Sequence, residues 1–459
     1  MKIWNYHHLQ PQVALAASAE GAAISNAIVS PELAKIQDTR EAKTAPDLPR
    51  FLALALQLAG LMLVFSLFNL EAPGFVRRVL AVAFGAFLVH YWLPFRFKEP
   101  FWVAVSVAAA FPLLGVEASS VLIGGGLVIF AILRAPFAMR GKLALLAILF
   151  GALMYGRATG ALNLPGAFFP VFGAIFMFRL VIYLYDLSHS RQTAQLVPFL
   201  SYFFILPNYV FTLFPVIDFQ TMRRGYYQRD AHTIAQQGIQ WMTRGTIQLI
   251  LYRAIVYFND AFLPDQVTSF GKLAATIVLT YLLYMNVSGH FHLIVGMLHL
   301  FGYDLPETNR RYLLASSISD FWRRANIYWK DFMVKLVYFP VYFKLRKKGD
   351  LRAQIWATFA VVVVTWALHV YQSFWLIGKW TVSWPDSIFW IILGLLMMAN
   401  LLYERRHKRR VLRASWSARA VRVLQTMGTF ALIATLWTMW SSPGLSAWIY
   451  LMTHWTHSK

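Results

Sequence analysis

Long apolar runs follow one another along the chain from residue 51 onward. A straight helix of about 20 residues crosses the hydrocarbon core of a bilayer, and slightly shorter runs are accommodated by local thinning. Eleven runs have a suitable length: 51–70, 79–95, 101–115, 116–133, 166–186, 195–216, 242–262, 272–300, 352–376, 384–402 and 421–441. The pattern therefore predicts an all-α polytopic membrane protein with about 11 transmembrane helices, since helices satisfy their backbone hydrogen bonds internally.

One further apolar run, 142–156, is shorter and lies between Arg134, Arg140 and Lys142 on one side and Arg157 on the other. If it crossed the bilayer, one of these basic clusters would lie outside, against the bias of basic residues toward cytoplasmic loops. We therefore expect a re-entrant or tilted half-span here. Eleven crossings then place the N-terminus in the cytoplasm and the C-terminus outside.

Composition supports a membrane protein and excludes several other classes. The chain of 459 residues is 58% hydrophobic and only 14% charged, more apolar than a soluble domain can cover. Its formal net charge is +22, but the basic clusters flank the apolar runs, so nucleic acid is a poor explanation and anionic lipid is a better one. The absence of cysteine excludes disulfides, thiolate metal sites and cysteine nucleophiles.

The basic and polar segments outside the runs give the expected organisation. Residues 405–410 form the strongest orientation signal, and their simplest interpretation is a topology anchor on anionic lipid. Residues 1–50 contain no spanning run and mix acidic with basic side chains, so we expect a cytoplasmic or interfacial tail. Residues 51–459 would form the membrane-embedded domain, with a core at 195–402. We find no internal repeat of the kind that marks many transporters.

The segment 303–350 is unusual because charged and large aromatic residues alternate densely between apolar runs. It is too apolar for a free loop and too charged to cross lipid. Polar backbone at membrane depth is tolerated only where protein or a water-filled cavity covers it. We therefore expect a re-entrant or interfacial helical hairpin that forms one wall of a site.

A single histidine, His369, lies deep in the apolar run 352–376. Thr365, Gln372 and Ser373 share its helix face at spacings of i−4, i+3 and i+4. Polar side chains at such depth normally face a bundle interior or a water-filled cavity. A neutral imidazole there can accept a proton from a hydroxyl, as a general base does in acyl transfer to an alcohol. Alternatively, His369 is a structural residue bonded to a neighbouring helix.

Asn326 is the second polar candidate. If the hairpin is helical, Trp322 and Trp329 share its face, and Asp320–Arg324 and Asp331–Lys335 form i,i+4 ion pairs. The amide N–H groups of Asn326 could then stabilise a carbonyl or thioester oxygen. Alternatively, the amide ties the hairpin to a neighbouring span.

Three histidines in the run 272–300 invite a metal-binding interpretation: His290, His292 and His299. His290 and His292 point to different helix faces, and no carboxylate or thiolate accompanies them. Interhelical hydrogen bonds are the favoured interpretation, and we expect no metal site.

The order of these parts resembles the membrane-bound O-acyltransferase family. The resemblance covers roughly residues 200–380. It is carried by Phe214-Pro215, Ser288-Gly289, Phe301-Gly302, the Pro306-Glu307-x-Asn309 motif, Phe321-Trp322-Arg323-Arg324, and the lone His369. The closest-looking branch is bacterial, that of the alginate O-acetylation and teichoic-acid D-alanylation membrane proteins. The chain departs from that branch at Asn326, where its polysaccharide acylators usually carry His; at Ala325; at His292; and in the spacing of Trp366 from His369.

The resemblance implies a fold and a set of roles. Helices would surround a central tunnel, His369 would be the catalytic histidine and Asn326 the second polar residue. Residues expected to bind substrate or donor are Trp322, Arg323, Arg324, Trp329, Lys330, Trp366, Gln372 and Ser373. Guanidinium groups suit the phosphates of a donor, although anchoring to lipid phosphates is an equal alternative.

The expected activity is transfer of a short acyl group, such as acetyl, from a cytoplasmic thioester to a hydroxyl of a cell-envelope glycan or polyol. Acyl-CoA or an acyl-carrier-protein thioester would be the cosubstrate, with no permanently bound cofactor. The expected location is a bacterial inner membrane, and a periplasmic esterase-like protein would be a possible partner beside membrane lipids. The alternatives are acylation of a lipid or small lipophilic alcohol, and a transporter or flippase without chemistry.

Overall fold

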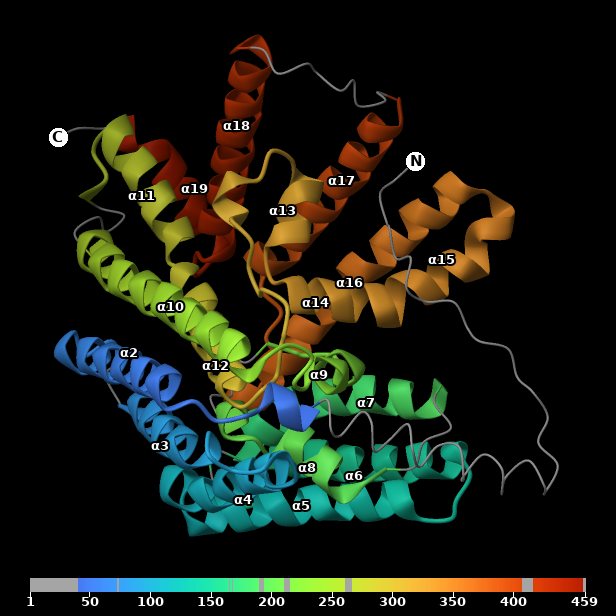
Figure 1. Ribbon diagram of the computed structural model, residues 1–459. Helices are drawn as coiled ribbons and strands as arrows, with labels where there is room; N and C mark the ends of the chain where they lie inside the picture. Colours follow the sequence, from blue (N-terminus) through green and yellow to red (C-terminus); the bar gives the residue numbers. More distant parts are fainter. Residues whose placement is uncertain are drawn as a thin grey trace. The chain divides into compact units, whose positions relative to one another are not determined.

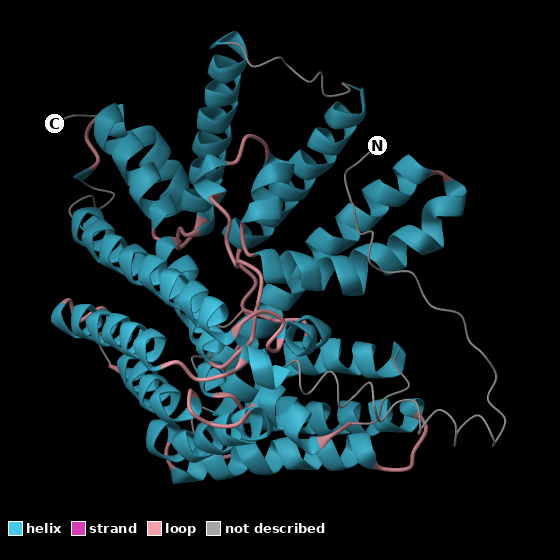
Figure 2. Cartoon of the chain, viewed as in Figure 1, coloured by secondary structure: helices cyan, strands magenta, loops and turns pink. Residues whose placement is uncertain are grey.

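The computed structural model describes residues 40–71, 74–164, 166, 168–189, 194–209, 215–260, 266–406 and 416–456. The chain divides into two units, Met1–Ala45 and Pro46–Lys459. Only residues 40–45 of the first unit are described, and they include a short helical turn. The described part of the second unit consists of helices joined by loops, with no strand and one isolated antiparallel bridge between Tyr226 and Tyr303 (Figure 2).

Nine segments of the described chain are long and apolar enough to cross a membrane. They are α2 (Leu48–Leu67), α4 (Phe95–Leu114), α5 (Val116–Arg134), α6 (Met139–Thr159), the π-helix η1 with α7 (Pro170–Phe176 and Met177–His189), α11 with α12 (Phe270–Leu282 and Met285–Leu300), α16 (Asp350–Ile377), α17 (Trp384–Arg406) and α18 (Trp416–Trp440). This is the architecture of a polytopic helical membrane protein, as the apolar pattern predicted.

Three predicted spans are not among these nine. The run 79–95 lies largely in α3 (Phe75–His90), which has only 16 residues. The run 195–216 contains the short helix α8 (Leu196–Phe203) and a 3₁₀ turn (Leu206–Tyr209), and part of the run lies outside the described residues. Residues 242–260 of the run 242–262 belong to α10 (Ala231–Asp260), a helix of 30 residues that is too polar to be counted among the nine.

The half-span expected at 142–156 is instead part of one continuous helix of 21 residues, α6. The basic residues were expected to mark the ends of the apolar run. In the structure they lie within a helix or donate to carbonyl groups at the ends of neighbouring helices. Lys142 donates to the carbonyl of Leu133 at 2.6 Å, and Arg157 lies 3.5 Å from the carbonyl oxygens of Trp375 and Leu376. Cations at helix C-termini are favourable, so these charges need not mark the ends of a span.

Two clusters of buried apolar side chains organise the second unit. The larger one joins α2–α8, α10, α12, α14 (Ile327–Met333) and α16. The smaller one joins α11, α13 (Ile318–Arg324), α16, α17 and α18. Figure 1 shows α4, α5 and α6 side by side in one group and α11, α17 and α18 in another. Helix α16 contributes to both clusters.

Helices α10 and α12 approach each other unusually closely because glycines face glycines. A Cβ atom added at Gly238 would lie 2.5 Å from the carbonyl oxygen of Gly296, and one at Gly245 would lie 2.6 Å from that of Gly289. Small residues at helix interfaces allow such close contact in membranes. The packing fixes α12, which lies in the wall of the cavity described below.

The segment 303–350 is a succession of short elements rather than one helical hairpin. After an irregular stretch and a 3₁₀ turn (Tyr312–Leu314) come α13, α14, a π-helix (Val334–Tyr338), α15 (Phe339–Leu345) and a 3₁₀ turn (Arg346–Lys348). Helix α15 packs against α16, which follows it. The remaining helices are α9 (Phe219–Gly225) and α19 (Leu445–Thr453).

Candidate functional site

A cavity of about 320 Å³ lies between the two apolar clusters. Helices α7, α12, α13, α14, α16, α17 and α18 contribute to its wall. The wall is largely aromatic: Phe178, Tyr284, Phe291, Phe321, Trp322, Trp329, Phe389, Trp390, Trp437 and Trp440. Four other side chains bring polar groups to it: Asn326, Lys330, His369 and Gln372. An apolar cavity with a few convergent polar groups is the usual form of a ligand site.

His369 enters this cavity from α16 and is surrounded by indole rings. Its ring centroid lies 5.0 Å from that of Trp390, 5.9 Å from that of Trp440 and 6.2 Å from that of Trp329. Within the described chain no side chain or backbone group hydrogen-bonds to its ring nitrogens. Within the described residues, the imidazole is therefore not tied to a neighbouring helix by a hydrogen bond.

Asp386, in the first turn of α17, fixes two of the three indoles. Its carboxylate oxygen Oδ1 accepts hydrogen bonds from Nε1 of Trp390 at 3.2 Å and from Nε1 of Trp440 at 2.7 Å. One carboxylate therefore ties α17 to α18 and sets the rings that enclose His369.

The sequence predicted that Asn326 shares a helix face with Trp322 and Trp329. In the structure it does not. It lies between α13 and α14 with φ of 43°, in the left-handed region that Asn tolerates better than most residues. It is the N-cap of α14, and its Oδ1 accepts from the backbone N–H of Trp329 at 3.2 Å. Because the oxygen is engaged in the cap, the side-chain NH₂ group remains as a donor at the cavity.

Trp329, another residue of the cavity wall, carries a second donor. The indole Nε1 of Trp329 is buried and has no hydrogen-bond partner, although the residue lines the cavity. Buried N–H groups normally find a partner, so an orphaned donor in a cavity wall indicates a place where a ligand oxygen can bind. The residues of the cavity wall thus bring together an imidazole, an asparagine amide and an indole N–H without a partner.

Asn309 holds the Asn326 backbone in place. Its Oδ1 accepts from the Asn326 N–H at 2.8 Å and from the Tyr284 hydroxyl at 3.3 Å. The flanking backbone is paired as well, since Arg310 N–H donates to the carbonyl of Arg324 and Ile327 N–H to that of Thr308. The stretch around Asn309 therefore fixes the break between α13 and α14. This gives a physical role to the Pro-Glu-x-Asn motif.

The basic residues near the site divide into two groups. Lys330 lines the cavity, is only 13% exposed and pairs with Asp331 at 2.7 Å. Arg323 and Arg324 lie outside the cavity lining and both contact Asp320, Arg324 at 2.9 Å, as the i,i+4 spacing predicted. Burial opposes ionisation of Asp320, but hydrogen bonds from Arg324 and the Ser316 N–H lower its pKa.

The predicted pair Asp331–Lys335 does not form. Lys335 lies in the π-helix after α14 and donates instead to Asp186 of α7 and to Asp218, at 2.6 Å in the second case. Wider π-helical turns move the i+4 side chain off the expected face. Lys335 consequently links this wall of the cavity to α7, through Asp186, and to the start of α9, through Asp218.

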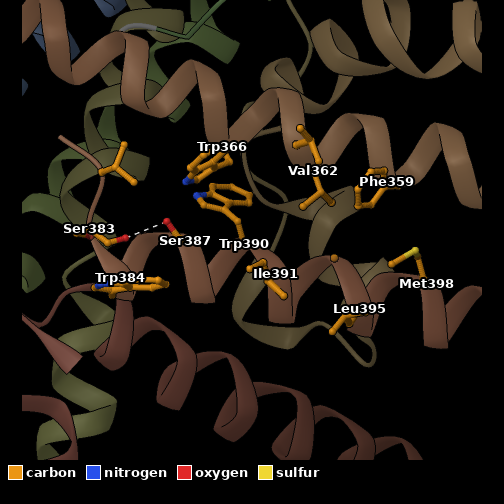
Figure 3. Close-up of a pocket in the computed structure, with 13 residues that line it drawn as sticks. Phe359, Val362, Trp366, Ser383, Trp384, Ser387, Trp390, Ile391, Leu395 and Met398 are labelled. Carbon is orange, nitrogen blue, oxygen red and sulfur yellow. Dashed lines mark hydrogen bonds between the residues drawn. The ribbon is translucent and has the colours of Figure 1, made fainter. Parts of the chain in front are cut away.

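The remaining predicted site residues lie at different places. Gln372 lines the cavity with His369. Ser373 donates to the carbonyl of His369 at 3.1 Å, within α16. Trp366 lines a second pocket, between α16 and α17 (Figure 3). Thr365 is buried and lines neither. Of the Phe214-Pro215 pair, Pro215 lines the cavity and Phe214 lies outside the described residues.

The three histidines of α12 hold hydrogen bonds. His292 Nδ1 bonds to Gln248 of α10 at 2.7 Å, whereas His290 and His299 bond to the carbonyls of Asn286 and Val295 in their own helix. No group of three or more metal-ligating side chains occurs among the described residues. The interhelical bond expected for this segment is thus confirmed at His292.

Sequence reasoning missed the cavity residues on α17 and α18. Asp386 and Trp390 are four residues apart in the first turns of α17, a spacing that could have indicated their hydrogen bond. Trp440 lies 54 positions after Asp386, and no local pattern connects the two. Their contact arises only when α17 and α18 pack together.

Comparison with known proteins does not assign a function, so any functional assignment rests on the site. No protein-family model matches the chain, and no curated protein matches it significantly in sequence. The described chain nevertheless has the architecture of a multi-pass helical membrane protein with nine apolar helices of spanning length. Within that architecture the residues lining one cavity include His369, an asparagine and a tryptophan whose buried indole N–H has no partner.

Proposed function

We propose that the protein is a membrane acyltransferase that moves a short acyl group from a cytoplasmic thioester to a hydroxyl of a cell-envelope glycan or polyol. The observation that carries the proposal is that His369, Asn326 and Trp329 line one cavity, the last two with side-chain N–H donors. A base that faces donors for a developing negative charge is what acyl transfer to an alcohol requires.

In the proposed step, the acceptor hydroxyl oxygen attacks the carbonyl carbon of the thioester while His369 takes the hydroxyl proton. A C–O bond forms, the C–S bond breaks, and the imidazolium returns the proton to the departing thiolate, so a free thiol leaves. Negative charge collects on the carbonyl oxygen meanwhile. The Asn326 NH₂ and the Trp329 indole N–H are suited to stabilise it in a cavity whose wall is largely aromatic.

The donor is proposed to be acyl-CoA or an acyl-carrier-protein thioester. Lys330 is the basic side chain of the cavity wall that could contact a phosphate, and Arg323 and Arg324 would extend the basic surface beyond it. The likeness in motif order to membrane-bound O-acyltransferases supports the same proposal. It also favours a bacterial inner membrane, a cytoplasmic N-terminus and a periplasmic esterase-like partner.

Donor turnover tests the proposal directly. Protein reconstituted in liposomes and given radiolabelled acetyl-CoA with a polyol acceptor should release free CoA. His369→Ala should abolish the release, because no other imidazole lines the described cavity. His189→Ala provides a control, because His189 is an exposed histidine at the end of α7 and outside the cavity lining.

Unchanged turnover in folded His369→Ala protein would remove His369 from the mechanism. If neither the original protein nor the variant turns over any thioester, while the cavity still binds a labelled lipid-linked glycan, the transporter alternative is favoured. Helix content by circular dichroism and elution as a single species establish that each variant is folded.

A further inference from the structure

A second pocket, larger than the first, lies on the outer side of the α16–α17 pair. It has a volume of about 500 Å³. Figure 3 shows side chains of α16 facing those of α17 across it. The two helices contribute chiefly Phe359, Val363, Trp366, Trp390, Ile391 and Leu395. We call this pocket the α16–α17 groove.

The lining of the α16–α17 groove is largely apolar, and its one buried polar atom without a hydrogen-bond partner is Nε1 of Trp366. Ser383 and Ser387 are its only hydroxyl residues and lie at one end. Ser387 donates to the carbonyl of Ser383 at 3.0 Å, and the Ser383 hydroxyl accepts from the N–H of Asp386 at 3.2 Å. These hydroxyl groups are already engaged, and apart from indole N–H groups the other lining side chains are apolar, so the chemistry of the groove suits a hydrocarbon.

The groove opens outward from two helices that are long and apolar enough to cross a membrane. Ile391 is 60% exposed and Leu395 58% exposed. From Ser387 to Met398 the lining of α17 extends about 16 Å at 1.5 Å per residue, roughly half of the 30 Å hydrocarbon core. The groove therefore has the depth of one leaflet, which is the depth that one lipid chain occupies.

Its serine end adjoins the connection between α16 and α17, where Lys379, Trp380 and Trp384 are exposed. Tryptophan is enriched where a membrane meets water, and a lysine beside it can contact a lipid phosphate. This end is thus suited to a headgroup, and the apolar remainder to the chain below it.

We propose that the α16–α17 groove binds one acyl chain of a membrane glycerophospholipid, with the headgroup at Lys379. The site is distinct from the His369 cavity, but Trp390 lines both. A chain in the groove would lie against the indole that flanks His369. The proposal concerns lipid binding alone and does not depend on the acyltransferase function.

Photo-crosslinking tests it. Purified protein in detergent is titrated with a phosphatidylcholine that carries a diazirine in one acyl chain, irradiated, and mapped by peptide mass spectrometry. We expect the peptide that contains residues 387–398 to be labelled at lower lipid concentration than α18, whose Leu424 is 67% exposed. We also expect this labelling to saturate.

Groove-filling variants make the result specific. Val363→Trp and Leu395→Trp place an indole in the groove at positions that are partly exposed, so both should fold. If the indole displaces two methylene groups of the chain, apparent affinity should fall about tenfold. Leu424→Trp is the matched control and should leave labelling unchanged. Labelling of 387–398 that never exceeds that of α18, or that persists in both filled variants, would overturn the proposal.

Discussion

At the scale of single residues, Asn326 combines two roles that substitutions can separate. Its side-chain oxygen caps α14, and its backbone occupies the left-handed region. Asp has a similar shape, accepts in the cap and tolerates the same conformation, but it lacks the NH₂ donor. We expect Asn326→Asp to retain stability and to lower acyl transfer about 10²- to 10³-fold, the effect of losing one oxyanion donor.

Comparison with Asn326→Ala provides the control. That variant loses the cap and also strains the backbone, so its melting temperature should fall together with its activity. Rates of thioester turnover and thermal unfolding are measured for both variants. Full activity in Asn326→Asp would show that Asn326 serves the fold alone.

Asp386 offers a second prediction at this scale. Asp386→Leu removes the acceptor shared by the indoles of Trp390 and Trp440, and each partly buried N–H left without a partner costs about 1–3 kcal/mol. We expect a lower melting temperature and altered near-ultraviolet circular dichroism from the reoriented indoles. Asp386→Asn keeps an acceptor oxygen and should differ little from the original protein. Equal effects of the two substitutions would contradict the hydrogen-bond argument.

The candidate residues were only partly predictable. His369 could be found from the sequence because a polar side chain deep in an apolar run is costly unless it faces a cavity. The geometry of Asn326 could not be predicted. The prediction assumed one continuous helix through Arg324-Ala325-Asn326, whereas the chain leaves the helix there. The only local sign was the tolerance of Asn for positive φ, which is too common in turns to identify this break.

At the scale of elements, the glycine contacts between α10 and α12 predict that a glycine-to-alanine change has different effects at two positions. Gly238→Ala places a methyl group 2.5 Å from the carbonyl oxygen of Gly296, and overpacking should destabilise the protein by about 1–2 kcal/mol after the gain in helix propensity. Gly60→Ala on α2 meets nothing within 4 Å and should be neutral or slightly stabilising. Thermal unfolding of the two variants is the measurement. Destabilisation by both, to a similar extent, would refute the close approach.

Sequence periodicity identified most elements but misjudged several boundaries. Apolar runs predicted α2, α5, α16, α17 and α18 because lipid-facing helices are apolar on most sides. The same rule failed at α6, whose basic residues bind carbonyls of other helices, and at α8, where an apolar run bends into a 3₁₀ turn. Both errors arise from tertiary contacts, which the local sequence pattern does not reveal.

At the scale of the whole molecule, the cavity lies where the two apolar clusters meet. His369 belongs to α16, which packs in both clusters, and the indoles around it come from α14, α17 and α18. No sequence pattern specifies that these helices converge, because the choice among apolar helix faces depends on packing. A site of this kind becomes visible only when the helices are assembled.

The orientation of α16 in the bilayer decides from which side a donor could reach that cavity. The helix has 28 residues, about 42 Å at 1.5 Å per residue, enough to place Lys347 and Lys379 on opposite faces of a 30 Å core. Lys347 lies in the basic turn Arg346–Lys348, which the positive-inside rule assigns to the cytoplasm. Because the chain has no cysteine, Lys347→Cys and Lys379→Cys each introduce a single reactive thiol.

A membrane-impermeant maleimide applied to intact cells should therefore label Lys379→Cys, whereas Lys347→Cys should react only after the membrane is permeabilised. Both lysines are exposed, so burial does not decide the outcome. The reverse pattern would place Lys330 and its neighbours away from a cytoplasmic thioester and remove the proposed donor route. Labelling of both from one side would mean that α16 does not cross the membrane, and the cavity around His369 would then need a different setting.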